Sequence, residues 1–296
     1  MKRRQFLKTA SGAVALAMSP WLGKSVFAEG EKSFKGNEIV ELGQTGIRVS
    51  RLAQGTGTGG SRRSSRFTRM GKEAFDDLLQ YSLKQGITFI DMADSYGTHT
   101  FVKESIKQVS REKLALLSKI WAYKEPWNTP SGGAKKELDR FRSELRVDMI
   151  DVCLIHCMVS ENWTTEFERV RDELSELKEK GIVRAVGVSC HYFGALEVAA
   201  EHPWVDVIMA RINHKGGRRY FCDDSLENVT AVLKKARQNG KAIIGMKIFA
   251  NGRLVQPNEK DESLSYVFKN DLVDAVSIGM CSKEEIDDTM MRMAKI

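Results

Sequence analysis

No run of eighteen or more apolar residues occurs among the 296 residues of this chain. A helix that crosses a bilayer needs about 20 apolar residues, so no membrane-spanning helix is expected. The chain also lacks a Cys-x-x-Cys pair, which disfavours zinc ribbons and cysteine-ligated iron–sulfur clusters, and no metal site is predicted. Its five cysteines are an odd number in a large chain, so they do not indicate a disulfide framework.

Acidic residues are missing from the first 28 positions, which hold five basic residues. Residues 2–8, Lys-Arg-Arg-Gln-Phe-Leu-Lys, resemble a twin-arginine export signal, and small residues up to Ala28 suit a signal peptidase. The alternative is a frayed amphipathic helix. We expect a signal peptide at 1–28, cleavage after Ala28 and a mature chain of 29–296 with no membrane anchor. The protein would then be periplasmic or otherwise exported, with the twin-arginine export machinery as a partner.

The apparent basicity of the chain belongs mostly to this segment. Without it, 46 basic residues against 39 acidic ones become 41 against 39, and the formal charge falls from +7 to +2. Nucleic-acid binding is therefore not expected. One local group of basic residues remains, either as a solvated loop or as a contact for a phosphate or an acidic substrate: Arg62, Arg63, Arg66 and Arg69.

After residue 50, eight short apolar runs alternate with segments of helical period. The runs suit buried parallel strands, because such strands are covered on both faces. The helical segments include a stripe at 75–83 that ends at Gly86, and two more at 164–180 and 224–239. Strands that alternate with helices indicate βαβ units, and eight units in about 250 residues predict an α/β fold, a (β/α)8 or TIM barrel. The predicted strands are 51–54, 87–90, 114–117, 150–155, 182–188, 205–209, 242–246 and 275–278.

A glycine-rich segment, Gly55-Thr-Gly57-Thr-Gly59-Gly60, superficially resembles the dinucleotide motif of doubly wound sheets. Its third glycine is misplaced, and a long polar loop follows where that motif begins a helix. We therefore expect these glycines to let the backbone approach a ligand at the barrel mouth.

Four polar residues stand at or just after the ends of predicted strands: Asp91, Tyr96, Lys119 and His156. Strand ends of a parallel barrel converge on one mouth, so the four are expected to meet there. Each alone has an ordinary explanation, as a turn residue, a snorkelling lysine or a core histidine. Together, Lys119 held by Asp91 would lower the pKa of Tyr96, while His156 would hydrogen-bond a substrate oxygen. This set suits protonation of a carbonyl oxygen as hydride arrives at carbon.

In order and spacing, residues 91–97, 118–119 and 151–156 resemble the motifs that carry the Asp, Tyr, Lys and His tetrad of the aldo-keto reductase superfamily. The similarity extends from about residue 41 to residue 293, and residues 42–52 resemble the hairpin that opens its bacterial members. The resemblance implies a (β/α)8 barrel with an N-terminal β-hairpin. It also implies an NAD(P)H-dependent oxidoreductase that reduces carbonyls, with Tyr96 as general acid.

The resemblance places a nicotinamide cofactor along the strand ends, although this pocket departs from the family pattern. Met209 and Ile212 stand where the family has a glutamine and a tyrosine, and Cys190 replaces an asparagine. NADPH is expected because the family favours it, and these residues do not decide between NADPH and NADH. The implied cofactor contacts are Gly55, Thr56, Ser189, Cys190, Met209, Lys247, Gly279, Ser282 and Asp288.

The expected substrate is a small carbonyl compound or a sugar. Trp121, Trp163 and His191 follow predicted strands and are candidates to contact it, although aromatic loop residues also serve in packing. Two other functions stay open. One is a barrel that senses a cofactor or ligand without turnover, and the other is a redox-neutral sugar epimerase or isomerase that keeps its nicotinamide tightly bound.

Overall fold

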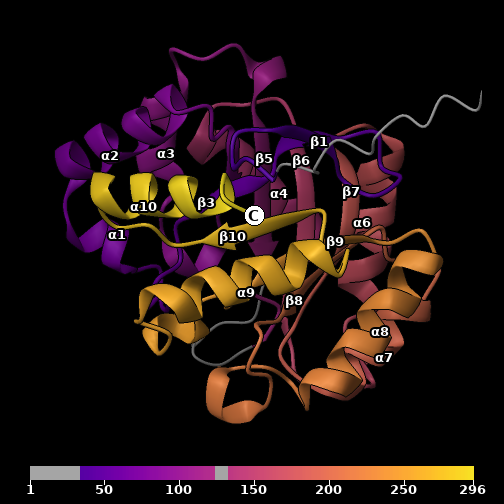
Figure 1. Ribbon diagram of the computed structural model, residues 1–296. Helices are drawn as coiled ribbons and strands as arrows, with labels where there is room; N and C mark the ends of the chain where they lie inside the picture. The colour runs from indigo at the N-terminus through magenta and orange to yellow at the C-terminus, as the bar shows by residue number, and fades with distance from the viewer. Residues whose placement is uncertain (1–33, 124–132) are drawn as a thin grey trace, which may run out of the picture. The chain divides into compact units, whose positions relative to one another are not determined.

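Parallel strands closed into a barrel, as the sequence predicts, make up the centre of the computed structural model, which describes residues 34–123 and 133–296. The strands close in the order β10-β3-β4-β5-β6-β7-β8-β9, with helices between successive strands (Figure 1). The predicted signal segment and its cleavage site lie outside the described residues. The barrel strands are β3 (Leu52–Gly55), β4 (Phe89–Asp91), β5 (Ala115–Ile120), β6 (Ile150–Met158), β7 (Val183–Cys190), β8 (Val207–Arg211), β9 (Ala242–Met246) and β10 (Ala275–Ile278).

Burial on both faces explains why short apolar runs predicted these strands. All six residues of β5 are buried, for example. The predicted ranges agree with β9 and β10, whereas β5 and β6 continue past their apolar runs to Ile120 and Met158. The extra residues include Lys119 and His156, so these polar side chains end the apolar run without ending the strand.

The helices follow the predicted periods with one difference. The helix expected at 164–180 is two helices, because Phe167 (φ −117°, ψ 26°) leaves helical geometry between α5 and α6. The one expected at 224–239 is α8, whose N-cap Ser225 accepts the Asn228 N–H at 3.1 Å. The helices are α1 (Arg66–Arg69), α2 (Lys72–Lys84), α3 (His99–Ile106), α4 (Ala134–Leu145), α5 (Trp163–Glu166), α6 (Glu168–Glu179), α7 (Phe193–Glu201), α8 (Leu226–Gln238), α9 (Pro257–Lys269) and α10 (Lys283–Met293), with 3-10 turns η1 (Asp94–Tyr96), η2 (Arg111–Lys113), η3 (Arg218–Tyr220) and η4 (Ala250–Gly252).

Two apolar clusters form the core, because successive residues of a strand point to opposite faces. One cluster lies between strands and helices, and it includes Ile90, Leu116 and Ile155. The other fills the barrel interior, where Phe89 and Leu154 are fully buried. The interior is therefore a packed core, and a ligand must bind at an end of the barrel.

An antiparallel hairpin of β1 (Ile39–Glu41) and β2 (Arg48–Ser50) closes the end where the strands begin. Its Leu42, Ile47 and Val49 join the interior cluster. The hairpin does not cover the opposite end, where the strands finish, so that end is available to a ligand. Within the described ranges, no helix combines the length and apolar character needed to cross a membrane. The same residues contain no group of three or more His, Cys, Asp or Glu side chains arranged to hold a metal ion.

Candidate active site

A layer of polar side chains caps the barrel interior at the carboxyl ends of the strands. Leu117 belongs to the interior cluster, and Lys119 is the next residue on the same face of β5. In the same way, Asp91 follows Phe89 on β4, and His156 follows interior residues on β6. Strand periodicity thus brings three titratable groups from neighbouring strands to one place, as the sequence predicts.

Asp91 and Lys119 form a buried ion pair at the centre of this layer. The Lys119 ammonium donates to Asp91 Oδ1 and, at 2.8 Å, to the Met92 carbonyl. The other carboxylate oxygen of Asp91 accepts the Ser277 hydroxyl at 2.6 Å. Burial lowers the pKa of Lys119, and the attraction of Asp91 opposes that shift. Ser277 was missed from the sequence, although its place on the inward face of β10 marks it.

Tyr96 ends the 3-10 turn η1, five residues after Asp91 along the chain. Its ring lies against the backbone of the glycine-rich segment, where a Cβ on Gly57 would come within 2.3 Å of two ring carbons. A Cβ on Gly60 would come within 2.5 Å of the ring. The Lys119 ammonium lies 4.9 Å from the ring centroid. Positions 57 and 60 therefore require glycine, because the Tyr96 ring fills the space that a Cβ would occupy.

His156 lies edge-on to Tyr96, with 5.6 Å between the ring centroids. Its Nδ1 is 3.4 Å from the Ser95 hydroxyl. Burial, followed by the charge of Lys119, holds the pKa of His156 well below its usual value of 6.5. The imidazole is therefore neutral at pH 7 and offers one N–H as a donor.

The expected lowering of the Tyr96 pKa by Lys119 is not found. Burial, and then the charge of Asp91, raise the pKa of Tyr96 well above its usual value of 10. Because Asp91 pairs with Lys119, the ammonium does not act on the phenol as an isolated charge. The structure thus favours a neutral Tyr96 that holds its proton, which is the form a proton donor needs.

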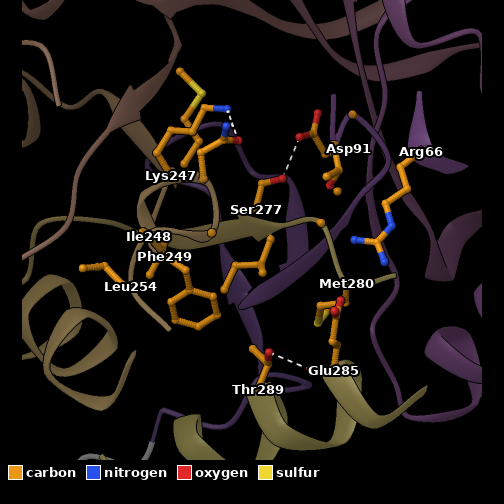
Figure 2. Close-up of a pocket in the computed structure, with 18 of the residues that line it drawn as sticks. Arg66, Asp91, Lys247, Ile248, Phe249, Leu254, Ser277, Met280, Glu285 and Thr289 are labelled. Carbon is orange, nitrogen blue, oxygen red and sulfur yellow. Dashed lines mark hydrogen bonds between the residues drawn. The ribbon is translucent and has the colours of Figure 1, made fainter. Parts of the chain in front are cut away.

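A groove runs from this layer to α10, with a volume of about 420 Å³ (Figure 2). Asp91, Tyr96 and Ser277 line one end, and Glu285 and Thr289 line the other. The groove passes between the segment that follows β9 and the glycine-rich segment that follows β3. Its length along the strand ends suits an elongated ligand.

Three basic side chains line the groove: Arg66, Lys247 and Lys260. Figure 2 shows Arg66 and Lys247 on opposite sides of it. Lys247 donates to Asn251 at 3.2 Å, and Lys260 is paired with Asp288 at 3.3 Å. Asp91, Glu285 and Asp288 line the groove as well. Because Lys119 pairs with Asp91 and Lys260 with Asp288, Arg66 and Lys247 are the cations that fit the phosphates of a nicotinamide dinucleotide.

The nine residues implied as cofactor contacts fall into two groups. Five line the groove: Gly55, Met209, Lys247, Gly279 and Asp288. The other four lie elsewhere. Thr56 donates its hydroxyl to the Asp91 carbonyl at 2.9 Å, and the Ser189 hydroxyl accepts the Cys157 N–H at 2.8 Å.

Cys190 and Ser282 complete the second group. Cys190 is fully buried in the layer between strands and helices. The Ser282 hydroxyl accepts the Glu285 N–H at 3.2 Å and caps α10. The side chains of these four residues therefore hold the protein structure around the mouth and do not line the groove.

Of the three aromatic residues considered for substrate contact, two lie near His156. Trp121 and His191 have ring centroids 5.5 and 6.5 Å from that of His156. The expectation for Trp163 is wrong, because its side chain is fully buried and packs against Trp204 and His202. The sequence placed it just after β6 but did not show that α5 turns it into the core.

The arginine group after β3 has divided roles. Arg63 pairs with Glu144 at 2.6 Å, and Arg69 donates to the Ser64 hydroxyl at 3.2 Å. Arg66 lines the groove. One of the four arginines is therefore placed for the phosphate contact considered from the sequence.

Comparison with known proteins agrees with this geometry. A model described as the Aldo/keto reductase family matches residues 51–295. The chain is 28% identical over 157 residues to the NADPH-dependent D-xylose reductase of Meyerozyma guilliermondii, which covers 43% of this chain and 48% of that one. It is 31% identical over 121 residues to the glyoxal reductase of Bacillus subtilis, covering 40% and 41%. The chain thus spans about half the length, or less, of these curated relatives.

Solved structures resemble the fold over more of the chain. A Pseudomonas aeruginosa structure assigned to the aldo-keto reductases superposes with a TM-score of 0.72 at 22% identity, covering 89% of this chain and 97% of that one. The holo form of an aldo-keto reductase from Bacillus halodurans gives a TM-score of 0.67 at 17% identity, covering 86% and 90%. At these identities the likeness concerns the fold.

Proposed function

Because the chain belongs to the aldo/keto reductase family, we propose that it reduces an aldehyde, ketone or sugar carbonyl with a nicotinamide cofactor, NADPH being the first candidate. The observation that carries the proposal is Tyr96 beside neutral His156, above the buried Asp91–Lys119 pair, at one end of the groove. The names of two relatives, an NADPH-dependent D-xylose reductase and a glyoxal reductase, support both the reaction and the cofactor.

In the proposed reaction, a reduced nicotinamide bound in the groove would supply a hydride to the carbonyl carbon. His156 donates its N–H to the carbonyl oxygen and holds that oxygen beside Tyr96. The Tyr96 phenol gives its proton to the same oxygen as negative charge develops there, and an alcohol results. The Asp91–Lys119 ion pair lies beside the phenolate left on Tyr96, which regains a proton from solvent.

A Tyr96→Phe variant tests this proposal, because it removes one hydroxyl and keeps the ring against Gly57. We expect kcat to fall by at least about a hundredfold, the usual size of a general acid's contribution. Dinucleotide affinity, measured by fluorescence titration with NADPH and NADH, should stay within about threefold of wild type. Tyr266→Phe is the matched control, since that hydroxyl lies on α9 and bonds Thr230 at 2.8 Å.

Two results would contradict the reductase proposal. Full turnover by Tyr96→Phe would assign the proton to another group. Failure of the wild-type protein to bind either nicotinamide would favour a barrel that senses another ligand.

We also propose export by the twin-arginine route, with cleavage after Ala28. Its support is the sequence of residues 2–8 and the small residues before position 29, all of which lie outside the described residues. In a bacterium that has this route, Arg3→Lys with Arg4→Lys should retain the protein in the cytoplasm. Cell fractionation measures retention in the cytoplasm, and N-terminal sequencing of the exported protein locates the cleavage site. A first residue other than Glu29 would show that cleavage does not follow Ala28.

A further inference from the structure

A second cavity, of about 340 Å³, opens at the ends of β7 and β8, beyond the groove. Besides Tyr192, four polar side chains line it: His191, Arg211, Arg218 and Asp223. Asp223 and Arg218 come from the connection between β8 and α8, which the sequence motifs do not mark. Nothing in the proposed cofactor groove uses these four side chains.

Asp223 is a buried carboxylate whose hydrogen bonding is only half complete. Its side chain is fully buried, and Oδ1 accepts two donors of the Arg211 guanidinium, one of them at 2.7 Å. The other oxygen, Oδ2, is buried and meets no donor among residues 34–123 and 133–296. A buried carboxylate oxygen without a donor costs free energy, so a ligand that brings a hydroxyl to it gains affinity.

A neutral donor group suits the position next to the unpartnered oxygen of Asp223. A carboxylate or phosphate at that position would be repelled by Asp223, and an amine would be repelled by Arg211 and Arg218. His191 is a neutral group in this lining. Burial lowers the pKa of its imidazole to about 3, so the ring carries no charge at pH 7. A hydroxyl group can donate to Asp223 and also accept from a guanidinium or an imidazole N–H.

The cavity is placed to receive the far end of a substrate whose carbonyl lies at Tyr96. The ring centroid of His156 lies 6.5 Å from that of His191 and 5.6 Å from that of Tyr96. Arg211 holds this arrangement, because it donates to the His191 carbonyl at 2.7 Å as well as to Asp223. A substrate chain of several carbons can therefore reach from the catalytic tyrosine to the second cavity.

We propose that the cavity of His191, Arg211, Arg218 and Asp223 is a subsite for the distal hydroxyl groups of a polyhydroxylated carbonyl substrate, an open-chain sugar. The inference rests on the proposed function, because the subsite serves the substrate of that reduction. The preference for hydroxyl groups rests on the oxygen of Asp223 that has no hydrogen-bond donor among the described residues. Asp223 accepts from one substrate hydroxyl, and Arg218 donates to the oxygen of the same or a neighbouring hydroxyl.

Two substrates of equal length test the subsite: D-xylose, which has hydroxyls along its chain, and pentanal, which has none. The measured quantity is the ratio of kcat/KM for D-xylose to that for pentanal, so the small open-chain fraction of the sugar cancels between proteins. Asp223→Asn and Arg218→Gln should each lower this ratio about tenfold, the loss expected for one hydrogen bond to a charged group.

Each variant has a matched control one residue away. Asp224→Asn and Arg219→Gln make the same chemical changes on side chains that do not line the cavity, Asp224 being partly exposed and Arg219 exposed. Both controls should keep the wild-type ratio. Arg218 is itself exposed, so its variant should fold normally even if loss of the Arg211 partner destabilises Asp223→Asn.

A binding measurement separates the subsite from the reaction. Xylitol carries the hydroxyls of the sugar without a carbonyl, and titration calorimetry should show weaker xylitol binding by Asp223→Asn and Arg218→Gln than by wild type. If the wild-type protein reduces neither substrate with either nicotinamide but this difference in xylitol affinity remains, the proposed function fails and the subsite stands. If turnover is present and neither the ratio nor the xylitol affinity changes in the two variants, the subsite is wrong and the proposed function stands.

Discussion

At the scale of single residues, the pairing of Lys119 with Asp91 decides which protonation states the site holds. Buried charges are stable only with a partner, and each of these two supplies it for the other. The pair thereby leaves two neutral groups above it, the phenol of Tyr96 and the imidazole of His156. Both can donate a hydrogen bond to a carbonyl oxygen, which is the arrangement that reduction needs.

The same pKa directions predict the pH dependence of turnover. Tyr96, with its pKa raised above 10, keeps its proton at any lower pH, and His156, with its pKa lowered below 6.5, is neutral at any higher pH. Both groups are therefore in their working form from pH 7 to pH 9, and kcat for reduction should change less than about twofold across that interval. Steady-state assays at constant ionic strength measure this, and a clear inflection inside the interval would show that another group titrates. The reverse oxidation, which needs the Tyr96 phenolate, should instead become faster as the pH rises.

Arg66 gives a second prediction at this scale, for the cofactor groove. Its guanidinium lines the groove opposite Lys247 and would meet the negative charge of the dinucleotide (Figure 2). Arg66→Gln should weaken NADPH binding by about fivefold in fluorescence titrations, and less at high salt, because charge attraction is screened. Arg69→Gln is the control, since Arg69 belongs to the same short helix and does not line the groove. Equal loss of affinity in both variants would point to disturbance of α1, and no loss in either would remove Arg66 from the cofactor site.

At the scale of elements, a group of ion pairs behind the mouth fixes the turn η1 that carries Tyr96. Arg140 of α4 donates to Asp94, the first residue of η1, at 2.6 Å, and to Glu144 at 3.1 Å. Glu144 in turn lies 3.0 Å from His99 Nδ1, and His99 Nε2 lies 2.8 Å from the Ser118 hydroxyl beside Lys119. The helix α4 and the strand β5 are thus joined to the turn that carries Tyr96.

An Arg140→Met variant should therefore lower kcat/KM about tenfold without changing dinucleotide affinity, because a small misplacement of Tyr96 is costly to the reaction. It should also lower the free energy of unfolding by about 1–3 kcal/mol, since Asp94 loses a close partner. Arg142→Met is a matched control on the same helix, where the arginine pairs with exposed Asp139. If urea unfolding shows the loss of stability while kcat/KM stays at the wild-type value, the group of ion pairs holds α4 but does not position Tyr96.

The positions of the strands and helices were easier to predict than the packing that buries particular side chains. The apolar runs located all eight strands, because each barrel strand is buried on both sides, and the order of polar residues at their ends located Asp91, Tyr96, Lys119 and His156. The break at Phe167 and the burial of Trp163 depend on how α5 packs, and a helical period cannot show this. Asp223 was missed for a related reason. It lies in a connection without a period, and its importance comes from an oxygen that the fold leaves without a donor.

At the scale of the whole barrel, stability and function are assigned to opposite ends. The hairpin β1–β2 fills the end where the strands begin, through Leu42, Ile47 and Val49. Gly43 in its turn has φ +55° and lies so close to Ala242 that a Cβ would come within 2.7 Å of that residue. The groove and the second cavity lie at the other end. A change in the hairpin should therefore alter folding and leave the reaction as it is.

Ile47→Ala tests this separation, because Ile47 is fully buried beneath the barrel interior. Removing its outer carbons leaves a cavity, so the free energy of unfolding measured in urea should fall by about 2–5 kcal/mol. Ile39→Ala is the matched control in the same hairpin, where the side chain is 43% exposed and the cost should be within about 0.5 kcal/mol. Below the unfolding transition, both variants should keep the wild-type kcat and KM, since the packed interior separates the hairpin from Tyr96 and His156. A lower kcat in folded Ile47→Ala would show that strain passes through the interior layers to the mouth, and that the two ends of the barrel are not independent.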